Sequence, residues 1–106
     1  MPKISIIIPT FNESKHLPLL LSDLTIPNAG VEIIIVDCNS GDKTRDIANL
    51  YATKIYKLNE KNRGLQLNTG AKKAKGEWFF FLHADSRLYR GWFKKVKSVI
   101  SAVSYT

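Results

Sequence analysis

The fold is decided by the stretch Glu77-Trp78-Phe79-Phe80-Phe81-Leu82-His83-Ala84-Asp85-Ser86. Its large apolar residues are consecutive, so they cannot all face water, and the run is too short to span a bilayer. It predicts a strand buried on both faces of a parallel sheet. The run ends in polar, titratable side chains, which we therefore expect at the carboxyl end of a central strand. In open α/β sheets that is where ligands bind.

The residues that follow this strand are the first candidates for a site. His83 and Asp85 are two positions apart, so an extended backbone places them on one side. An imidazole beside a carboxylate can hold a divalent cation. The alternative is a polar loop in which Asp85 or Ser86 caps the next helix.

Working outward, the rest of the chain alternates between strand and helix patterns. Residues 3–9 and 31–36 are apolar, β-branched runs that predict two further buried strands, and 54–58 predicts a short third one. Helices are predicted between and after them from apolar spacing. The inward-facing residues are expected to be Leu17, Leu20, Leu21 and Leu24, then Ile47, Leu50 and Tyr51, then Leu67, Ala71 and Ala74, and finally Trp92, Val96, Val99, Ile100 and Val103.

This order predicts an α/β fold of three layers, αβα, around a mostly parallel, Rossmann-like sheet. We expect the strand order 3-2-1-4 with strand 1 central. The turns after strands 1, 2 and 4, at 9–13, 37–42 and 83–86, should then line one crevice. At 106 residues the chain forms a single domain.

Charge and cysteine content narrow the partners. Sixteen basic against nine acidic residues give a net charge of +7, which favours phosphates, nucleic acid or an anionic membrane surface, although a solvated basic face explains it equally. Cys38 is the one cysteine, so no internal disulfide forms and a reducing, cytoplasmic setting is expected. Contact with a membrane surface stays open.

Several enzyme classes are disfavoured by motifs that are missing. The chain has neither the glycine pattern of dinucleotide-binding Rossmann folds nor that of P-loop NTPases, and it lacks the Gly-x-Ser-x-Gly of α/β-hydrolases. Cys38 follows a buried strand and could act as a nucleophile with His16 or His83 as base. An inert, buried thiol is the preferred interpretation.

Three acidic residues, Glu13, Asp37 and Asp85, converge on one sheet edge of a basic protein. A metal ion, together with acceptors for ribose hydroxyls or a base N–H, would account for them. The alternative is that each caps a helix, which is the only role we expect for Asp42.

These turns resemble the N-terminal half of a family-2 inverting glycosyltransferase, which has the GT-A fold. The resemblance is carried, in order, by residues 5–13, 34–44, 62–71, 74–77 and 81–86. It implies a nucleotide-diphosphate-sugar donor, most simply a UDP-sugar. The residues it assigns to the nucleotide are Pro9, Thr10, Glu13, Asp37, Arg63 and Asp85, with Asp37 accepting from the base or ribose and Arg63 near the base and phosphates.

The resemblance also implies a metal site. His83-Ala84-Asp85 occupies the position of the Asp-x-Asp motif that holds Mn²⁺ or Mg²⁺ against the diphosphate, with His83 in place of the first Asp. An imidazole ligates Mn²⁺ better than Mg²⁺. The His-Ala-Asp form resembles a bacterial and archaeal subgroup of the family.

Family members are usually much longer, and their second half brings the acceptor pocket and a carboxylate base. This chain ends one helix after Asp85, so no catalytic residue is identified and the acceptor is unknown. We expect a donor-binding domain of a glycosyltransferase, or a non-catalytic nucleotide-binding module that acts with a partner chain. An unpaired edge of the Trp78 strand would favour a homodimer or such a partner. The third hypothesis is a basic nucleic-acid-binding domain. If the chain is a donor-binding domain or a nucleotide-binding module, we expect no nucleic acid as a partner.

Overall fold

Strands and helices alternate along the whole chain. The computed structural model describes residues 3–25, 30–51 and 54–104. The elements are β1 (Ile4–Thr10), α1 (Leu17–Leu24), β2 (Val31–Asp37), α2 (Thr44–Leu50), β3 (Lys54–Lys57), α3 (Arg63–Lys73), β4 (Trp78–Phe81) and α4 (Trp92–Ser104).

The four strands form one parallel sheet in the order β3-β2-β1-β4, which confirms the predicted order. β1 lies inside the sheet, and each of its residues is buried because strands cover both edges and helices cover both faces. Thr10 pairs with Asp37, so β1 and β2 end level with each other. The turns that follow them therefore start from the same edge.

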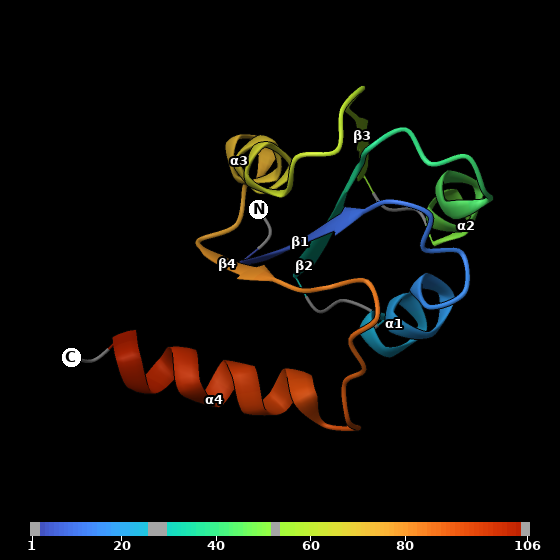
Figure 1. The fold of residues 1–106 in the computed structure, drawn as a ribbon. Helices are drawn as coiled ribbons and strands as arrows, with labels where there is room; N and C mark the ends of the chain where they lie inside the picture. The colour runs from blue at the N-terminus through green and yellow to red at the C-terminus, as the bar shows by residue number, and fades with distance from the viewer. Residues whose placement is uncertain (1–2, 26–29, 52–53, 105–106) are drawn as a thin grey trace.

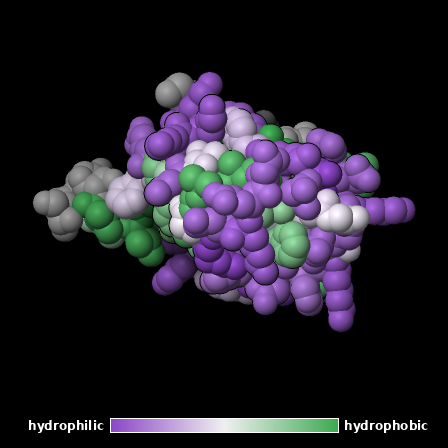
Figure 2. Space-filling view, turned by 45° about the horizontal axis from the view of Figure 1, so that its top comes forward, coloured by the Kyte–Doolittle hydropathy of each residue, from purple (hydrophilic) through white to green (hydrophobic). Residues whose placement is uncertain are grey.

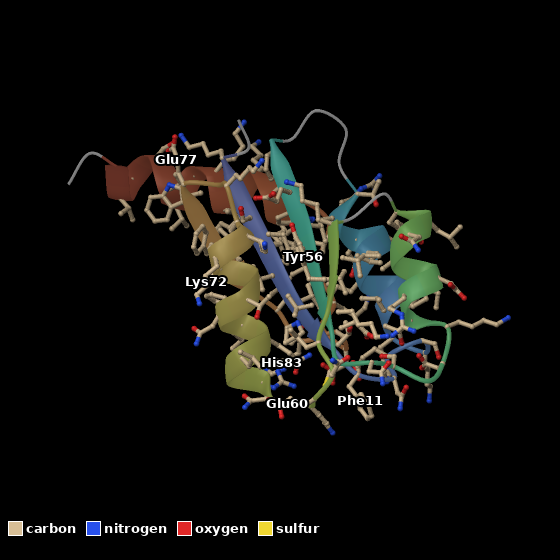
Figure 3. All side chains as sticks on the ribbon, turned by 90° about the horizontal axis from the view of Figure 1, so that it is seen from above. Phe11, Tyr56, Glu60, Lys72, Glu77 and His83 are labelled. Atoms are coloured by element: carbon tan, nitrogen blue, oxygen red, sulfur yellow. The ribbon has the colours of Figure 1, made fainter. Side chains whose placement is uncertain are left out.

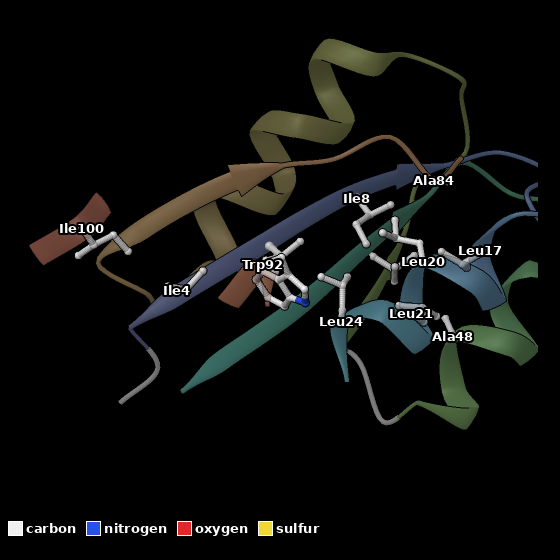
Figure 4. Packing of buried hydrophobic residues seen from close by; sticks show 12 residues of the cluster. Ile4, Ile8, Leu17, Leu20, Leu21, Leu24, Ala48, Ala84, Trp92 and Ile100 are labelled. Carbon is white, nitrogen blue, oxygen red and sulfur yellow. The ribbon is translucent and has the colours of Figure 1, made fainter. Parts of the chain in front are cut away.

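Helices lie on both faces of the sheet, which confirms the three-layer architecture (Figure 1). One face is the larger core, in which Ile4, Ile6 and Ile8 of β1 meet apolar residues of α1, α2 and α4. Figure 4 shows the leucines of α1 in this core: Leu17, Leu20, Leu21 and Leu24. The other face is smaller and is covered by α3, which packs on Ile7, Ile34 and Val36.

A glycine allows α3 to lie this close to β1. A Cβ at Gly70 would come 2.4 Å from Cγ2 of Ile7 and 3.3 Å from Cγ2 of Val36. Real Cβ atoms do not approach so closely, so the helix would have to move outward or the core side chains shift.

The prediction that the Trp78 strand is buried on both faces is wrong. β4 is an edge strand, paired with β1 only, and Phe79 and Phe81 are 42% and 50% exposed. Trp78 and Phe80 point the other way and pack on the larger core. α3 covers β1 and β2 rather than β4, which leaves the Phe79 side of the edge strand open.

Two helices also differ from their predicted inner faces. In α2, Leu50 is 82% exposed, whereas Thr44 and Ala48 are buried, because the covered face runs through Thr44, Ile47 and Ala48. In α4, Trp92 and Ile100 are buried as expected, but Val99 and Val103 are about half exposed. α4 extends past the edge of the sheet, and Figure 2 shows hydrophobic residues open to solvent near its C-terminal end, on a surface that is otherwise mostly hydrophilic.

A buried carboxylate ties together the amino-terminal end of the sheet. Glu32 of β2 accepts hydrogen bonds from Oγ of Ser5 at 2.5 Å, Nζ of Lys54 at 2.6 Å and the backbone N–H of Lys75 at 2.7 Å. Burial raises the pKa of Glu32, but these donors outweigh it and bring that pKa to about 2. The carboxylate thereby links β1, β2 and β3 to the segment that enters β4.

Among the described residues, no helix combines the length and the apolar character required to cross a membrane.

Candidate functional site

A cleft of about 360 Å³ opens at the carboxyl ends of β1 and β4. Three segments line it: the turn after β1, the start of α3 and the turn after β4. The lining residues are Pro9, Thr10, Phe11, Glu13, Lys61, Arg63, Gln66, His83, Ala84 and Asp85. Figure 3 shows Phe11 and His83 at this end of the sheet and Glu77 at the opposite end.

The turn after β1 is held in place by the turn after β2. Asn12 and Asn39 both have a left-handed backbone, with φ of 53° and 54°, a conformation that asparagine tolerates better than most residues. The backbone N–H of Asn12 donates to Oγ of Ser40 at 2.8 Å, and the N–H of Gly41 donates to Oδ1 of Asn12 at 2.8 Å. The first wall of the cleft is therefore fixed by side chains that lie outside it.

Asp42 belongs to the same arrangement. Its carboxylate accepts from the backbone N–H of Thr44 at 3.0 Å, as a helix-capping residue does, and from the N–H of Ser14 at 3.1 Å. Burial raises the pKa of Asp42, but the bonds from Thr44 and Ser14 outweigh it and lower that pKa to about 2. Asp42 thus bonds to the first residue of α2 from one position before the N-cap, Lys43, and it also anchors the turn after β1, a role beyond the capping that we expected.

Asp37 does not line the cleft. Its carboxylate is fully buried and accepts from Oγ1 of Thr10 at 2.7 Å and from both the backbone N–H and Oγ of Ser40, at 2.8 and 2.5 Å. A guanidinium nitrogen of Arg45 lies 3.1 Å away. In this structure its oxygens are committed to the protein, so the predicted direct contact of Asp37 with a nucleoside is not what the geometry provides. The turn after β2 supports the crevice from behind instead of lining it.

Gln66 closes the floor between the two central strands. Its amide nitrogen donates to the backbone carbonyls of Thr10 at 3.1 Å and Val36 at 2.9 Å. The carbonyl of Thr10 also accepts from the backbone N–H of Cys38 at 3.0 Å, so Gln66 adds a side-chain donor where the two strands end. α3 is thereby fixed to the sheet edge at its first turn.

The charged side chains of the cleft are of both signs. Nζ of Lys61 lies 4.8 Å from the ring centre of Phe11, and a guanidinium nitrogen of Arg63 lies 2.8 Å from Nδ1 of His83. Asp85 is exposed, and its carboxylate has no hydrogen bond or ion pair within the described part of the chain. The cleft therefore offers cations and a free carboxylate side by side.

The side chains of the cleft fit a metal site in which the phosphates of the ligand supply part of the coordination. No group of three or more His, Cys, Asp or Glu side chains that could hold a metal ion occurs among the described residues. Mg²⁺ and similar ions are often held by only one or two carboxylates together with substrate phosphates. The exposed carboxylate of Asp85 suits an ion that arrives with a diphosphate.

The structure brings together most of the residues that the sequence singled out. Six of them line the cleft: Pro9, Thr10, Glu13, Arg63, His83 and Asp85. Sequence reasoning missed Lys61 and Gln66 as lining residues, although Lys61 is two positions before Arg63; Phe11 belongs to the turn 9–13 that was expected to line the crevice, but no role was assigned to it. Cys38 is buried, which agrees with the inert thiol.

A comparison with family models matches residues 5–103 to "Glycosyl transferase family 2". The chain belongs to glycosyl transferase family 2. This family 2 domain is 37% identical over 95 residues to a PGL/p-HBAD biosynthesis glycosyltransferase of Mycobacterium tuberculosis, covering 83% of the domain and 37% of the relative. It is 35% identical over 98 residues to the poly(ribitol-phosphate) β-N-acetylglucosaminyltransferase TarP of Staphylococcus aureus, covering 84% and 30%.

Solved structures show the same fold. TarS of S. aureus superposes on the family 2 domain with a TM-score of 0.87 at 28% identity, over 94% of the domain and 32% of the TarS chain. The mannosyltransferase PcManGT of Pyrobaculum calidifontis, solved with GDP-Man and Mn²⁺, gives a TM-score of 0.80 at 25% identity, over 91% and 32%. The chain thus spans about a third of the length of these relatives, and the part it spans has the GT-A fold.

Proposed function

We propose that this family 2 domain binds a nucleotide-diphosphate sugar in the cleft at the carboxyl ends of β1 and β4. The observation that carries the proposal is the pairing of two cations, Lys61 and Arg63, with the exposed carboxylate of Asp85 in one cleft. Phosphate oxygens need the cations, and a divalent ion bound to the diphosphate needs the carboxylate. The partly exposed ring of Phe11 adds an aromatic surface for a base.

Uridine is the first base to test. TarS, at 28% identity, has been solved with UDP and with UDP-GlcNAc, and TarP is named as an N-acetylglucosaminyltransferase. PcManGT was solved with GDP-Man, so guanosine is the competing base. These relatives support a nucleotide-diphosphate-sugar donor and leave the sugar to experiment.

Each lining residue has a role that its position supports. Pro9, Thr10 and Glu13 border the nucleotide, and Arg63 and Lys61 neutralise the phosphates. Asp37 acts from beneath, because it fixes Thr10 through a 2.7 Å hydrogen bond. Asp85 holds Mn²⁺ or Mg²⁺, an ion that stabilises the negative charge of a departing diphosphate when it is bound.

The reaction that such a donor serves is an inverting displacement. The oxygen of an acceptor hydroxyl forms a bond to the anomeric carbon from the side opposite the diphosphate. The carbon–oxygen bond to the diphosphate breaks, and that oxygen leaves with the electron pair. The acceptor proton passes to a carboxylate base. Glu13 and Asp85 are the carboxylates of the described cleft, and both are assigned to the donor side.

A second candidate function is a module that binds the donor without transferring the sugar by itself, and the open edge of β4, with Phe79 and Phe81 exposed, is the observation that favours it. Such a module would act with a second copy or another chain. A cytoplasmic location and contact with an anionic membrane surface are the settings that we propose for either function.

Titration calorimetry with UDP, UDP-sugars, GDP-mannose and uridine, with Mn²⁺ and with chelator, tests the proposal. We expect UDP to bind more tightly with Mn²⁺. Asp85→Asn should weaken UDP binding in Mn²⁺ by about tenfold or more, because a charged partner of the metal–diphosphate complex is lost, and should leave uridine nearly unaffected. Asp46→Asn is the matched control, since Asp46 is an exposed aspartate of α2 that does not line the cleft.

Two results would contradict the proposal. One is the absence of binding to any nucleoside diphosphate with or without Mn²⁺. The other is tighter, strongly salt-dependent binding to single-stranded nucleic acid, which would favour the basic nucleic-acid-binding domain.

A further inference from the structure

The pair formed by Arg63 and His83 is the feature that the proposed function does not explain. A guanidinium nitrogen of Arg63 lies 2.8 Å from Nδ1 of His83, across a separation of 20 residues. Both side chains are exposed and both line the cleft beside Asp85. The geometry at this contact determines which nitrogen of the imidazole is available to a ligand.

Arginine can only donate a hydrogen bond, because its guanidinium stays protonated and has no acceptor. Nδ1 of His83 must therefore accept, and the neutral ring carries its proton on Nε2. The lone pair of Nδ1 is used by Arg63, and Nε2 presents an N–H. Neither nitrogen is then free to bind a metal ion.

Metal-binding histidines are arranged in the opposite way. They usually donate their second N–H to a carboxylate, a backbone carbonyl or water, which strengthens the ligating nitrogen. In this structure Nδ1 of His83 faces the guanidinium of Arg63, and that positive charge would repel a divalent ion bound to Nε2 of the same ring. The expectation that His83 replaces the first Asp of the motif as a metal ligand does not fit this contact.

We infer that His83 is a hydrogen-bond donor for the diphosphate and not a ligand of the metal. Arg63 fixes the imidazole with Nε2–H available, and the remaining N–H groups of Arg63 are free to bind phosphate oxygens alongside it. The protein's carboxylate toward the metal is then that of Asp85 alone. This inference rests on the proposed function, since it names how the same cleft recognises its anionic ligand.

The tautomer can be measured directly. Long-range ¹⁵N–¹H spectra distinguish a ring protonated on Nδ1 from one protonated on Nε2, and the chain has only two histidines. His16→Gln assigns the remaining signals to His83. We expect only the Nε2–H form in the neutral ring, and a measurable share of the Nδ1–H form in Arg63→Ala. A neutral ring protonated on Nδ1 would overturn the inference.

The metal's ligands give a second readout. Pulsed electron paramagnetic resonance of Mn²⁺ with UDP should show no coupling to a directly bound imidazole nitrogen. A coupling that is present in the unaltered chain and disappears in His83→Gln would overturn the inference and leave the proposed function standing.

The affinity for UDP distinguishes whether the side chain of His83 serves the phosphates or the metal. His83→Gln keeps an N–H donor and should bind UDP within about threefold of the unaltered chain in chelator, whereas His83→Asp should bind about tenfold or more weakly, because a carboxylate then faces the phosphates. Mn²⁺ should rescue His83→Asp in part, which raises its metal dependence, and uridine should bind all these variants alike.

His16→Asp is the matched control, because His16 is exposed and outside the cleft. If His83→Asp binds UDP in chelator as tightly as the unaltered chain, the inference is wrong. Failure of the unaltered chain to bind UDP or GDP under any condition would overturn both the inference and the proposed function.

Discussion

At the scale of single residues, Asp37 shows how a charge can serve a cleft that it does not line. Its buried carboxylate accepts from Thr10 and Ser40 and pairs with Arg45. Thr10 lines the cleft, so the position of its backbone and hydroxyl depends on a side chain one strand away. The role of Asp37 is to position Thr10.

The main effect of Asp37→Asn should therefore be a loss of folding stability. The amide would turn an NH₂ group toward donors, and breaking a hydrogen-bonded charge of this kind costs about 1.5–3 kcal/mol. Urea denaturation measures that loss. UDP affinity should fall as a consequence, and a variant of unchanged stability but tenfold weaker UDP binding would restore Asp37 as a direct contact.

At the scale of elements, the sequence predicts which segments are apolar enough to be buried. It does not show which strand or helix lies beside each segment. The isoleucines of β1 predicted a buried strand correctly, because a central strand is covered whatever its partners are. The same reasoning failed for Phe79 and Phe81, because an apolar run does not reveal whether a strand is central or at the edge.

Pairing between distant side chains was equally out of reach for the sequence. Pro9, Thr10, Glu13 and Asp85 were found because each follows a predicted strand or belongs to a recognised block. That Arg63 meets His83, and that Asp37 turns inward, depends on how the loops are folded and leaves no periodic pattern.

The contact of α3 with the sheet predicts opposite effects for two glycines of one helix. Gly70→Ala would force a methyl group against Ile7 and should destabilise the fold by about 1–3 kcal/mol, an overpacking cost. Gly64→Ala places its methyl group 3.5 Å from Oδ1 of Asn62, an ordinary contact, and should be neutral or stabilising by up to about 1 kcal/mol. Thermal unfolding of the two variants compares them. Equal melting temperatures would show that α3 does not pack as described.

The hydrogen bonds of Glu32 to Ser5, Lys54 and Lys75 predict that the stability of the fold falls at acid pH. The pKa of Glu32 is about 2 in the folded chain and 4.5 ordinarily, so its stabilising effect is complete above about pH 4.5 and is lost as the pH falls toward 2. Glu32→Gln should cost about 1–3 kcal/mol at neutral pH, by loss of charged hydrogen bonds to Ser5, Lys54 and Lys75. The difference in unfolding free energy between the two proteins should shrink below pH 4.5. A difference that stays constant down to pH 2.5 would show that the charge of Glu32 is irrelevant.

At the scale of the whole molecule, β4 and α4 each expose a pair of large apolar side chains. β4 has a strand on one side only, with Phe79 and Phe81 exposed, and α4 exposes Val99 and Val103 beyond the sheet. An open strand edge with apolar side chains is a site of association, and two copies can cover each other by two-fold pairing.

We expect the 106-residue chain to associate at micromolar concentration through β4. Sedimentation velocity should show a dimer or larger species, and Phe79→Lys should shift it to monomer, because a charged side chain blunts a strand edge. Leu50→Lys is the matched control, since Leu50 is exposed on α2, away from β4. A monomer in the unaltered chain, or dissociation by both variants, would contradict association through this edge.

The cross-bonding between the turns after β1 and β2 has a consequence for how a ligand enters. The amides of Asn12, Glu13 and Ser14 each donate to a side chain from residues 40–44. A loop that is already immobilised has little conformational entropy left to lose on binding, so less of the interaction free energy is consumed in ordering it. Amide hydrogen exchange at these positions should already be slow in the empty protein and change little when nucleotide is added. The rate of nucleotide capture should then be limited mainly by diffusion and not by rearrangement of this loop.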